Sequence, residues 1–219
     1  MSHIDQAKDG ELMKETTAIT CLFLDIGGVL LTDGWDHLAR RRAATKFKMD
    51  LAEMEARHHL TFEIFEEGKI TLEEYLRMVV FHKKRTFTRN QFRHYMFEQS
   101  KAFQETIDFV AQLKMNFGVK IAIVSNEARE LNAYRIKKFR LDRLADCFIS
   151  SCFVHMRKPD LDFFKLSLDI AQVRPEQVAF IDNTPMFVQV AETLGIRGIL
   201  HTDCESTRSK LSRLGMRVE

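Results

Sequence analysis

Residues 22–30, LFLDIGGVL, carry the strongest structural signal in this 219-residue chain. An apolar run leads to an acidic residue, Asp25, and two glycines follow, Gly27 and Gly28. A short apolar run with such an ending is typical of a buried strand, here with Asp25 at its carboxyl end. Because a buried, unpaired carboxylate is strongly unfavourable, we expect Asp25 to be ion-paired, hydrogen-bonded or bound to a metal ion. The alternative is an aspartate that only forms a tight turn.

The alternation of short apolar runs with helix-period segments predicts a parallel sheet. Five runs are typical of buried strands: residues 19–24, 119–124, 147–149, 178–181 and 196–200. Helical periodicity lies between the later runs, at residues 103–117, 161–171 and 187–194. Gly118 and Pro185 stand where a helix commonly ends and begins. Strands that alternate with such helices indicate right-handed crossovers, so we predict an α/β fold with helices on both faces of the sheet.

One segment, residues 35–101, breaks this alternation. It contains no convincing strand, but it has amphipathic helical patterns and a Thr71-x-x-Glu74 capping box. We therefore predict a helical insert. Since the insert begins soon after the first strand, it should emerge at the carboxyl edge of the sheet, where open α/β folds bind their ligands. It could then form a lid over the site.

Composition and charge exclude several classes of protein. Nine Gly, three Pro and 45% hydrophobic residues exclude collagen-like, low-complexity and broadly disordered chains. The formal net charge of +2, from 33 Lys and Arg against 31 Asp and Glu, excludes the global field of a dedicated nucleic-acid or membrane-surface binder. We interpret the basic runs at residues 40–42 and 83–85 as solvated helix faces. Neither nucleic acid nor membrane is therefore expected as a partner, and the sequence makes no prediction of oligomeric state.

The cysteines and the hydropathy favour a cytoplasmic protein. Cys21, Cys147, Cys152 and Cys204 form no C-x-x-C pair, which favours a reducing compartment. No stretch approaches the roughly 18 uninterrupted apolar residues of a membrane span. The first 17 residues are polar and lack the apolar region of a secretory signal.

A hydroxyl and an amide follow the second predicted strand. Residues 121–124, Ile-Ala-Ile-Val, end in Ser125 and Asn126 and run on toward a helix. Backbone N–H groups at a helix N-terminus bind anions, so Ser125 and its neighbours could hold an anionic group. The alternative is that Ser125 only caps the helix.

A lysine and a second aspartate complete the set of candidates. Pro159 favours an extended conformation for Lys158, which could then pair with Asp25 and with a bound anion; the alternative is an ordinary surface lysine. Asp182 ends the strand at residues 178–181, and Asn183 follows it. A second strand-end aspartate beside Asp25 would form an oxygen-rich site suited to Mg²⁺. Alternatively, Asp182 only caps the helix that begins near Pro185.

The order Asp25, Ser125, Lys158, Asp182, each just past an apolar run, closely resembles the four motifs of the haloacid dehalogenase superfamily of hydrolases. The resemblance covers about residues 19–200, and it is best to subgroups with Asp-x-Gly-Gly or Asp-x-Gly-Asn in the first motif and Arg-Lys-Pro in the third. The turn at residues 67–71, Glu-Gly-Lys-Ile-Thr, is similar to the helical cap of this class. The resemblance implies a Rossmann-like core at residues 19–34 and 102–219, a helical cap at 35–101 and an N-terminal extension at 1–18.

The resemblance also implies a role for each motif residue. Asp25 would be the nucleophile that forms an aspartyl-phosphate, and Asp25, Asp182 and the backbone carbonyl of Gly27 would hold Mg²⁺. Ser125 and the amide of Asn126 would bind the phosphoryl group. Lys158 would balance the negative charge of nucleophile and phosphate, because an anionic carboxylate attacks an anionic ester only when cations screen their repulsion. The implied activity is a Mg²⁺-dependent phosphatase acting on a small phosphorylated metabolite.

Gly27 departs from the family pattern. Most phosphatases of the family carry a second aspartate at this position, which protonates the leaving group and later activates water. General acid–base assistance is typically worth about 10²–10⁴-fold, so the glycine predicts slower turnover, an acid donated by the cap, or a substrate with a good leaving group. Histidines of the insert, His58 among them, could supply such an acid, although most such residues lie at the surface.

Asn183 is the second departure, because many relatives carry a carboxylate there. Its amide could accept a hydrogen bond from a metal-bound water or coordinate through oxygen, but one negative charge is lost from the site. We therefore predict weaker Mg²⁺ binding than in relatives with the carboxylate.

Two other functions remain open from the sequence. One is hydrolysis of a carbon–halogen bond, in which Asp25 forms an alkyl ester, although Gly27-Gly28-Val29 does not match the aromatic-Gly-Thr sequence usual in dehalogenases. The other is a catalytically weak binding or regulatory protein that retains the phosphate site. Phosphate release that depends on Mg²⁺, halide release without Mg²⁺, and ligand binding without turnover distinguish the three.

Overall fold

Five parallel strands form the central sheet of the protein, whose computed structural model describes residues 17–218. The strands lie in the order β3-β2-β1-β4-β5. They are β1 (Cys21–Leu24), β2 (Lys120–Ser125), β3 (Cys147–Ser150), β4 (Val178–Asp182) and β5 (Arg197–Leu200). All five runs that the sequence predicts as strands form strands, which confirms the α/β class. The N-terminal extension expected at residues 1–18 lies outside the described residues, except for its last two positions.

β1 lies at the centre of the sheet, and its position explains its unbroken apolar sequence. It pairs with β2 on one side and with β4 on the other. Leu22 and Leu24 pack into the hydrophobic core on one face, whereas Cys21 and Phe23 pack into the core on the opposite face. A parallel strand that is covered on both faces needs apolar residues at every position rather than at alternate ones.

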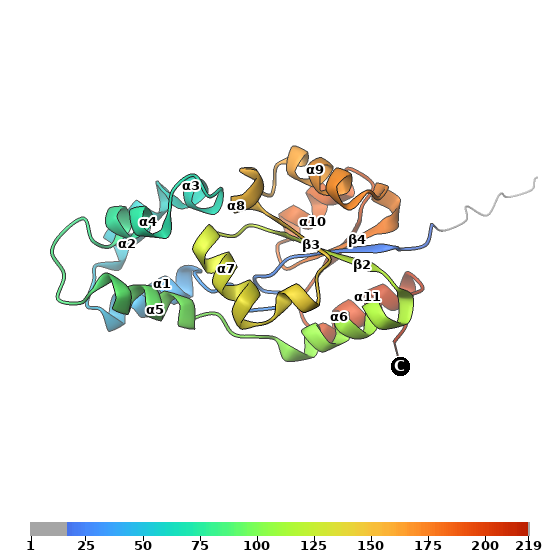
Figure 1. Cartoon of the computed structure of the whole chain (residues 1–219), viewed down its shortest axis with the longest axis horizontal. Coiled ribbons are helices and arrows are strands. Elements are labelled where there is room, and N and C mark those ends of the chain that lie inside the picture. Colours follow the sequence, from blue (N-terminus) through green and yellow to red (C-terminus); the bar gives the residue numbers. More distant parts are fainter. Residues whose placement is uncertain (1–16, 219) are drawn as a thin grey trace, which may run out of the picture.

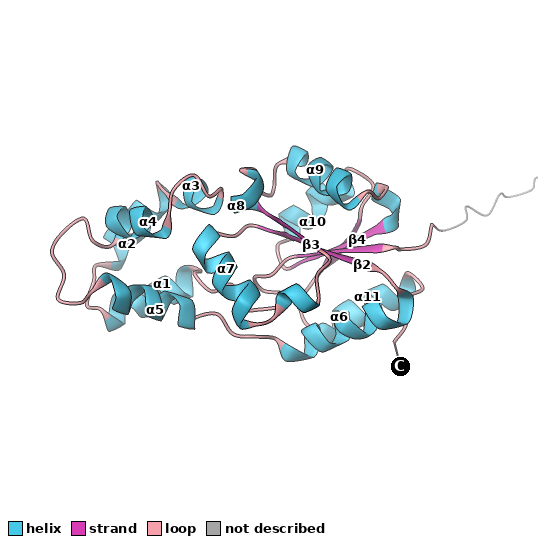
Figure 2. Cartoon of the chain, in the orientation of Figure 1, coloured by secondary structure: helices cyan, strands magenta, loops and turns pink. Residues whose placement is uncertain are grey.

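Helices cover both faces of this sheet, as Figures 1 and 2 show. α6 (Gln104–Phe117) and α11 (Cys204–Arg213) pack on one face, and α9 (Leu161–Ala171) and α10 (Pro185–Glu192) pack on the other. α6, α9 and α10 match predicted helices. α11 has no predicted counterpart, because Cys204 and Leu211 are its only buried apolar residues and give a weak periodic signal.

One helix follows β2 and another follows β3, and both begin near the carboxyl edge of the sheet. α7 (Arg129–Lys138) follows β2, and α8 (Ser151–Val154) follows β3. The single 3₁₀ turns η1 (Leu141–Arg143) and η2 (Pro175–Gln177) precede β3 and β4. α7 also contacts the insert, since Leu131 and the preceding Ala128 belong to the hydrophobic cluster of that segment.

Helices are the regular secondary structure of the insert between residues 37 and 98. Its helices are α1 (His37–Lys46), α2 (Leu51–His59), α3 (Phe62–Glu66), α4 (Leu72–Val79) and α5 (Arg89–Glu98). The predicted capping box at the start of α4 is present, with Thr71 and Glu74 exchanging hydrogen bonds. The insert has a hydrophobic cluster of its own around Tyr75 and Phe92. It lies beyond the carboxyl ends of the strands, on the side of the sheet away from the described start of the chain (Figure 1).

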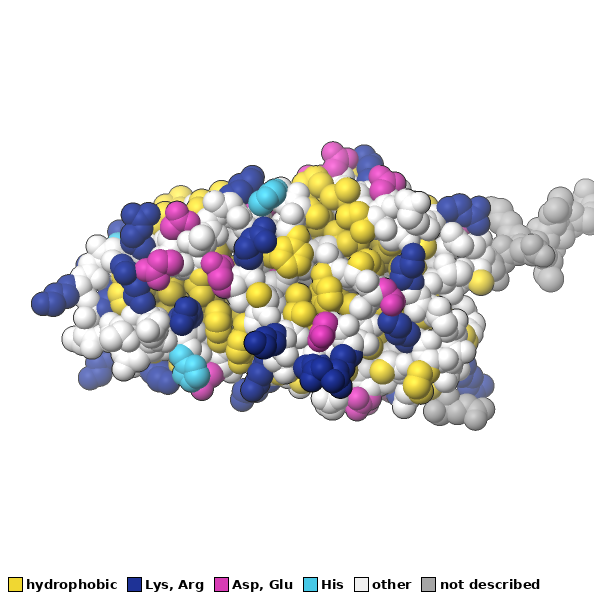
Figure 3. Space-filling model, in the orientation of Figure 1, with side chains coloured by type: hydrophobic (Ala, Val, Ile, Leu, Met, Phe, Trp, Pro, Cys, Tyr) yellow, Lys and Arg dark blue, Asp and Glu magenta, His cyan; other side chains and the backbone are white. Residues whose placement is uncertain are grey.

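The surface carries both signs of charge. On the face drawn in Figure 3, Lys and Arg side chains are spread along the molecule with Asp and Glu among them. The interpretation of residues 40–42 as a solvated face is wrong for Arg40. Its side chain is buried, donates to the carboxylate of Glu55 at 2.8 Å, and donates to the backbone carbonyl of Trp35 at 2.6 Å. Within residues 17–218, none of the helices combines the length and the apolarity that a membrane crossing requires.

Candidate active site

Asp25 stands at the carboxyl edge of the sheet, directly after β1. Its backbone N–H donates to the carbonyl of Ile181 at 3.0 Å, so the pairing with β4 continues one residue past the strand. This pairing fixes the main chain of Asp25 next to the end of β4. The residue is only 9% exposed, yet it lines the polar cavity described below. A carboxylate held in this way is fixed in direction and open to a ligand on one side.

Lys158 is the cation that balances this carboxylate. Its side chain is fully buried, and its Nζ lies 3.0 Å from Oδ1 of Asp25 and 2.5 Å from Oδ2 of Asp182. Burial alone would lower the pKa of Lys158, but the two carboxylates more than offset this effect and raise it. The ammonium therefore stays charged. It also lies over the rings of Phe180 and Phe187, at 5.4 and 5.2 Å from their centroids, where a cation is stabilised.

Asp182 is the second carboxylate of the group. Its Oδ2 accepts from Lys158, and its Oδ1 accepts from the backbone N–H of Thr184 at 2.7 Å. Burial raises the pKa of Asp182, and the attraction of Lys158 opposes that rise. Its Oδ1 holds the loop that leads into α10, but Thr184 rather than Asp182 is the N-cap residue of that helix. Asp182 thus combines the ion pair with a loop contact.

Ser125 and Asn126 occupy different positions from those that the sequence suggests. The expectation that Ser125 lies at a helix N-terminus is wrong, because α7 begins only at Arg129 and its N-cap residue is Ala128. Ser125 is instead buried beside the end of β1, where its Oγ accepts from the backbone N–H of Ile26 at 3.4 Å. Asn126 lines the cavity. The polar groups after β2 are therefore set by the loop and not by the helix.

Asn126 also anchors the segment that carries the lysine. Its Oδ1 accepts from the backbone N–H of Lys158 at 2.9 Å, and its Nδ2 donates to the carbonyl of the same residue at 3.0 Å. Two hydrogen bonds between one side-chain amide and the main chain of one residue restrict both distance and direction. Asn126 thus acts on the site as a positioning residue for Lys158, in addition to lining the cavity.

The glycine pair after Asp25 adjoins two polar side chains. Gly28 has a φ of 71°, and a Cβ at this position would lie 2.0 Å from Nδ2 of Asn183. Gly28 therefore needs glycine both for its backbone and for the space that Asn183 fills. A Cβ on Gly27 would lie 3.2 Å from Oδ1 of Asp33, which reaches this position from the loop after β1.

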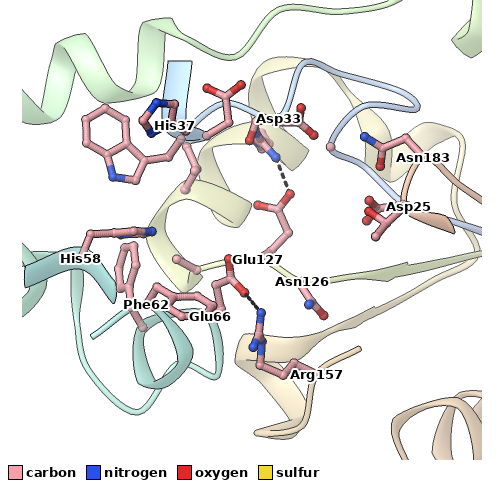
Figure 4. A pocket seen from close by; sticks show the side chains of 18 of the residues that line it. Asp25, Asp33, His37, His58, Phe62, Glu66, Asn126, Glu127, Arg157 and Asn183 are labelled. Carbon is pink, nitrogen blue, oxygen red and sulfur yellow. Dashed lines mark hydrogen bonds and ion pairs between the residues drawn. The ribbon is translucent and has the colours of Figure 1, made fainter. Parts of the chain in front are cut away.

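A cavity of about 330 Å³ opens above these residues, between the core and the insert (Figure 4). Figure 4 shows Asp25, Asp33 and Asn183 on one side, and Glu66, Phe62 and His58 of the insert on the other. The wall also includes charged and aromatic side chains: Trp35, Asp36, His37, Arg40, Phe65, Glu127, Arg135 and Arg157. A cavity of this size with many polar groups suits a small, hydrophilic ligand.

Asp33 contributes a carboxyl group to this cavity. Its side chain is exposed to the cavity, although the surrounding protein removes part of its hydration. This desolvation raises the pKa of Asp33, and the nearby carboxylates of Asp36 and Asp25 raise it further. Sequence reasoning missed this residue, because an aspartate next to a glycine in a loop is an ordinary turn signal.

A buried ion pair joins the core to both ends of the insert. Arg135 of α7 pairs with Glu127, and both side chains are almost completely buried. Burial raises the pKa of Glu127 to about 7, against the attraction of Arg135. The guanidinium also donates to the backbone carbonyls of Thr32 and Asp33, at 3.0 and 2.7 Å, and to the hydroxyl of Ser100 at 3.1 Å. These contacts tie the chain where it enters and where it leaves the insert.

A second ion pair lies in the wall of the cavity. Arg157, just before Lys158, donates to Oε2 of Glu66 in α3 at 2.8 Å and lies over the ring of Phe62, 4.9 Å from its centroid. Burial raises the pKa of Glu66, and Arg157 opposes the rise. Sequence reasoning predicted no role for either residue, since the pair forms between segments that lie 91 positions apart.

His58 lies on the insert side of the cavity. Its Nδ1 is 2.8 Å from the hydroxyl of Tyr75, which itself accepts from Nε1 of Trp35 at 2.9 Å. Burial, with a smaller contribution from Arg40, lowers the pKa of His58 to about 4. The imidazole is therefore neutral at neutral pH, which makes it a poor proton donor.

Comparison with known proteins places the chain in a family. A family model described as haloacid dehalogenase-like hydrolase matches residues 19–195. The chain belongs to this family. The "Phosphorylated carbohydrates phosphatase" of Thermotoga maritima is 24% identical over 139 residues, which make up 62% of this chain and 60% of that protein. The match thus spans less than two thirds of that relative's length.

Solved structures of other haloacid dehalogenase-like proteins share the fold. A HAD-like family hydrolase from Porphyromonas gingivalis has a TM-score of 0.73 and 21% identity, over 92% of this chain and 100% of that one. An aspartate-to-alanine variant of a HAD family enzyme from Bacteroides thetaiotaomicron, in complex with magnesium and inorganic phosphate, has a TM-score of 0.69 and 21% identity. It covers 82% of this chain and 92% of its own. These likenesses confirm the Rossmann-like fold.

The oxygen atoms at the site of this haloacid dehalogenase-like hydrolase are of the kind that binds a magnesium ion. The carboxylates of Asp25 and Asp182, the carbonyl of Gly27 and the amide oxygen of Asn183 are the hard oxygen donors that Mg²⁺ prefers. No group of three or more His, Cys, Asp or Glu in the described part of the chain is arranged to hold a metal ion. Such a set of few protein ligands suits an ion that keeps several of its waters.

Proposed function

We propose that this protein is a Mg²⁺-dependent phosphatase of small phosphorylated metabolites, with Asp25 as the nucleophile. The observation that carries the proposal is the buried Lys158, whose ammonium lies 3.0 Å from Asp25 and 2.5 Å from Asp182. Burying a charged ammonium is costly in free energy, so such a cation is expected where a reaction brings further negative charge to the same place. The family membership and the magnesium and phosphate bound to the Bacteroides thetaiotaomicron enzyme support the same chemistry.

Each residue of the site has its own role in the proposed phosphoryl transfer. The carboxylate of Asp25 attacks phosphorus, the bond from phosphorus to the leaving oxygen breaks, and an aspartyl-phosphate forms. Lys158 lowers the repulsion between the attacking carboxylate and the anionic ester. Ser125 and Asn126 bind the phosphoryl group, and Asn126 also holds Lys158 in place through the main-chain N–H and carbonyl of that residue. When bound by Asp25, Asp182 and Gly27, Mg²⁺ supplies further positive charge beside the transferring phosphoryl group.

We also propose that residues 35–101 act as a cap on a core formed by residues 19–34 and 102–219. The cavity wall that faces Asp25 includes side chains of this segment, such as His58, Phe62 and Glu66. A cap excludes water during the reaction and selects the substrate. The polar wall favours a hydrophilic substrate such as a sugar phosphate, and the Thermotoga maritima relative, named as a phosphatase of phosphorylated carbohydrates, supports this class.

A cytoplasmic location is part of the same proposal. All four cysteines are free, and burial raises the pKa of Cys21 to about 12 and that of Cys152 to about 11. Buried thiols of this kind act as small apolar side chains rather than as disulfide partners. They support a reducing compartment.

The test is phosphate release from a panel of sugar phosphates, nucleoside monophosphates and aryl phosphates, with and without Mg²⁺. We expect wild type to release phosphate only with Mg²⁺, and Asp25→Asn to lose the activity. Asp142→Asn, at an exposed aspartate outside the cavity, is the matched control and should match wild type. Turnover of no ester, or equal activity of Asp25→Asn and wild type, would contradict the proposal. Halide release from haloacids without Mg²⁺ would favour the dehalogenase alternative.

A further inference from the structure

The backbone at Gly27 does not itself require a glycine. Six glycines of the described chain, Gly28 among them, have a positive φ that L-amino acids rarely adopt. Gly27 does not have a positive φ. Its surroundings impose the restriction instead. A Cβ there would lie 3.2 Å from Oδ1 and 3.4 Å from Cα of Asp33. A side chain at position 27 would therefore press against Asp33.

The loop after β1 brings Asp33 to this position. The chain turns back between Ile26 and Leu31, with the N–H of Leu31 donating to the carbonyl of Ile26 at 2.9 Å and the N–H of Gly28 donating to the carbonyl of Leu31 at 2.7 Å. Arg135 then binds the carbonyl of Asp33 at 2.7 Å. The main chain on both sides of the carboxyl group is thus held, and the side chain projects into the cavity that contains Asp25 (Figure 4).

The other acidic side chains of the cavity are engaged elsewhere. Glu127 is paired with Arg135, and Glu66 is paired with Arg157. Asp36 accepts from the backbone N–H of Ala39 at 2.7 Å and caps α1. Asp33 is ion-paired to no Lys, Arg or His among residues 17–218, and the amide of Asn183 is the polar side chain beside it, so its carboxyl group can exchange a proton with a ligand in the cavity.

We propose that Asp33 is the general acid and base of the reaction, in place of the second aspartate that relatives carry at the position of Gly27. In the first half, the Asp25 carboxylate forms a bond to phosphorus, the ester bond breaks, and the leaving oxygen takes the proton of the Asp33 carboxyl group. In the second half, Asp33 as a carboxylate takes a proton from water. The water oxygen bonds to phosphorus, the bond to Asp25 breaks, and inorganic phosphate leaves. This inference rests on the proposed phosphatase function and extends it.

Comparing esters with different leaving groups tests the role of Asp33. An alkoxide needs a proton to leave, whereas dinitrophenolate does not, so a general acid matters only for the first. We expect Asp33→Asn to slow formation of the aspartyl-phosphate from glycerol phosphate by about 10²–10⁴-fold, and from dinitrophenyl phosphate by less than about tenfold. Because the base for the second half is also lost, the variant should release dinitrophenol in a burst and accumulate phosphorylated Asp25, which mass spectrometry detects.

A second variant tests the role of Asp33 by a gain of activity. The double variant Gly27→Asp/Asp33→Ala moves the carboxyl group to the position used by relatives and removes the side chain that would collide with it. It should recover part of the glycerol phosphate rate that Asp33→Ala loses. Asp142→Asn again serves as the control, and thermal melting verifies that each variant is folded.

The outcomes separate this inference from the function on which it rests. If wild type hydrolyses no ester, the proposed function fails. If wild type is active but Asp33→Asn slows both esters equally, or slows neither, the role of Asp33 as acid and base is wrong while the phosphatase function stands. Equal slowing together with weaker Mg²⁺ binding by calorimetry would assign Asp33 to the metal instead, and would also overturn the inference.

Discussion

Replacing Arg135 with methionine should strongly destabilise the protein, because it strands a buried charge. Arg135 and Glu127 are 1% and 3% exposed, and they form an ion pair. Removing one partner of a buried pair typically costs about 3–5 kcal/mol, since Glu127 is left buried without its partner and must either remain an unpaired charge or bind a proton. With a urea m-value of about 2–3 kcal/mol/M for a chain of this size, the unfolding midpoint should fall by about 1–2 M.

A double variant removes the charges of both Glu127 and Arg135. Glu127→Gln/Arg135→Met leaves no stranded carboxylate, so it should be at least about 1.5 kcal/mol more stable than Arg135→Met. Arg143→Met, at an exposed arginine, should unfold near the wild-type midpoint. Urea unfolding followed by circular dichroism measures all four proteins. If the double variant is no more stable than Arg135→Met, the loss does not come from the stranded charge and the reasoning is refuted.

Three further predictions follow from single sites. Gly28→Ala should cost about 1–3 kcal/mol more than Gly118→Ala in urea unfolding, because both positions have positive φ, 71° and 62°, but only at Gly28 would the Cβ collide with Asn183; equal losses would contradict this. Because the pKa of His58 is lowered to about 4, the unfolded chain binds this proton more tightly between about pH 6.5 and 4. Stability should therefore fall as the pH falls through that window, by up to about 2–3 kcal/mol. His58→Gln should remove most of this fall while His94→Gln, at an exposed site, should not, and unchanged slopes in His58→Gln would rule out His58 as the cause. Asn183→Asp should bind Mg²⁺ more tightly in calorimetric titration, since it adds a carboxylate beside Asp25; an affinity equal to or weaker than that of wild type would refute the weakening effect of the amide.

The core of the fold could be predicted closely from the sequence. The five apolar runs became the five strands, with bounds that differ by at most two residues. The helices that bury a wide apolar stripe were also found, whereas α11 was missed because its outer face is polar and its inner face is narrow. Hydrophobic periodicity is a local property of the chain, so elements with strong periodicity can be recognised without knowledge of their neighbours.

The candidate site could be predicted only in part. Asp25, Lys158 and Asp182 lie together, as parallel strands bring their carboxyl ends to one edge. The position of Ser125 was wrong, since the distance from a strand to the next helix depends on the loop between them. The ion pairs Glu66–Arg157 and Glu127–Arg135 could not be foreseen, because charged residues are frequent and their partners are chosen by packing.

Gly27 illustrates the division between sequence and tertiary structure. The sequence by itself determined that a strand ends at Asp25, that small residues follow it, and that an acid usual in relatives is absent at Gly27, because each of these is a matter of local order along the chain. Only the tertiary structure decided that the carboxyl group of Asp33 lies beside Gly27, with its Oδ1 3.2 Å from the point where a Cβ of residue 27 would stand. That contact depends on the turn of the loop and on the hold of Arg135 from another helix. Neither is encoded in the spacing of residues around Gly27.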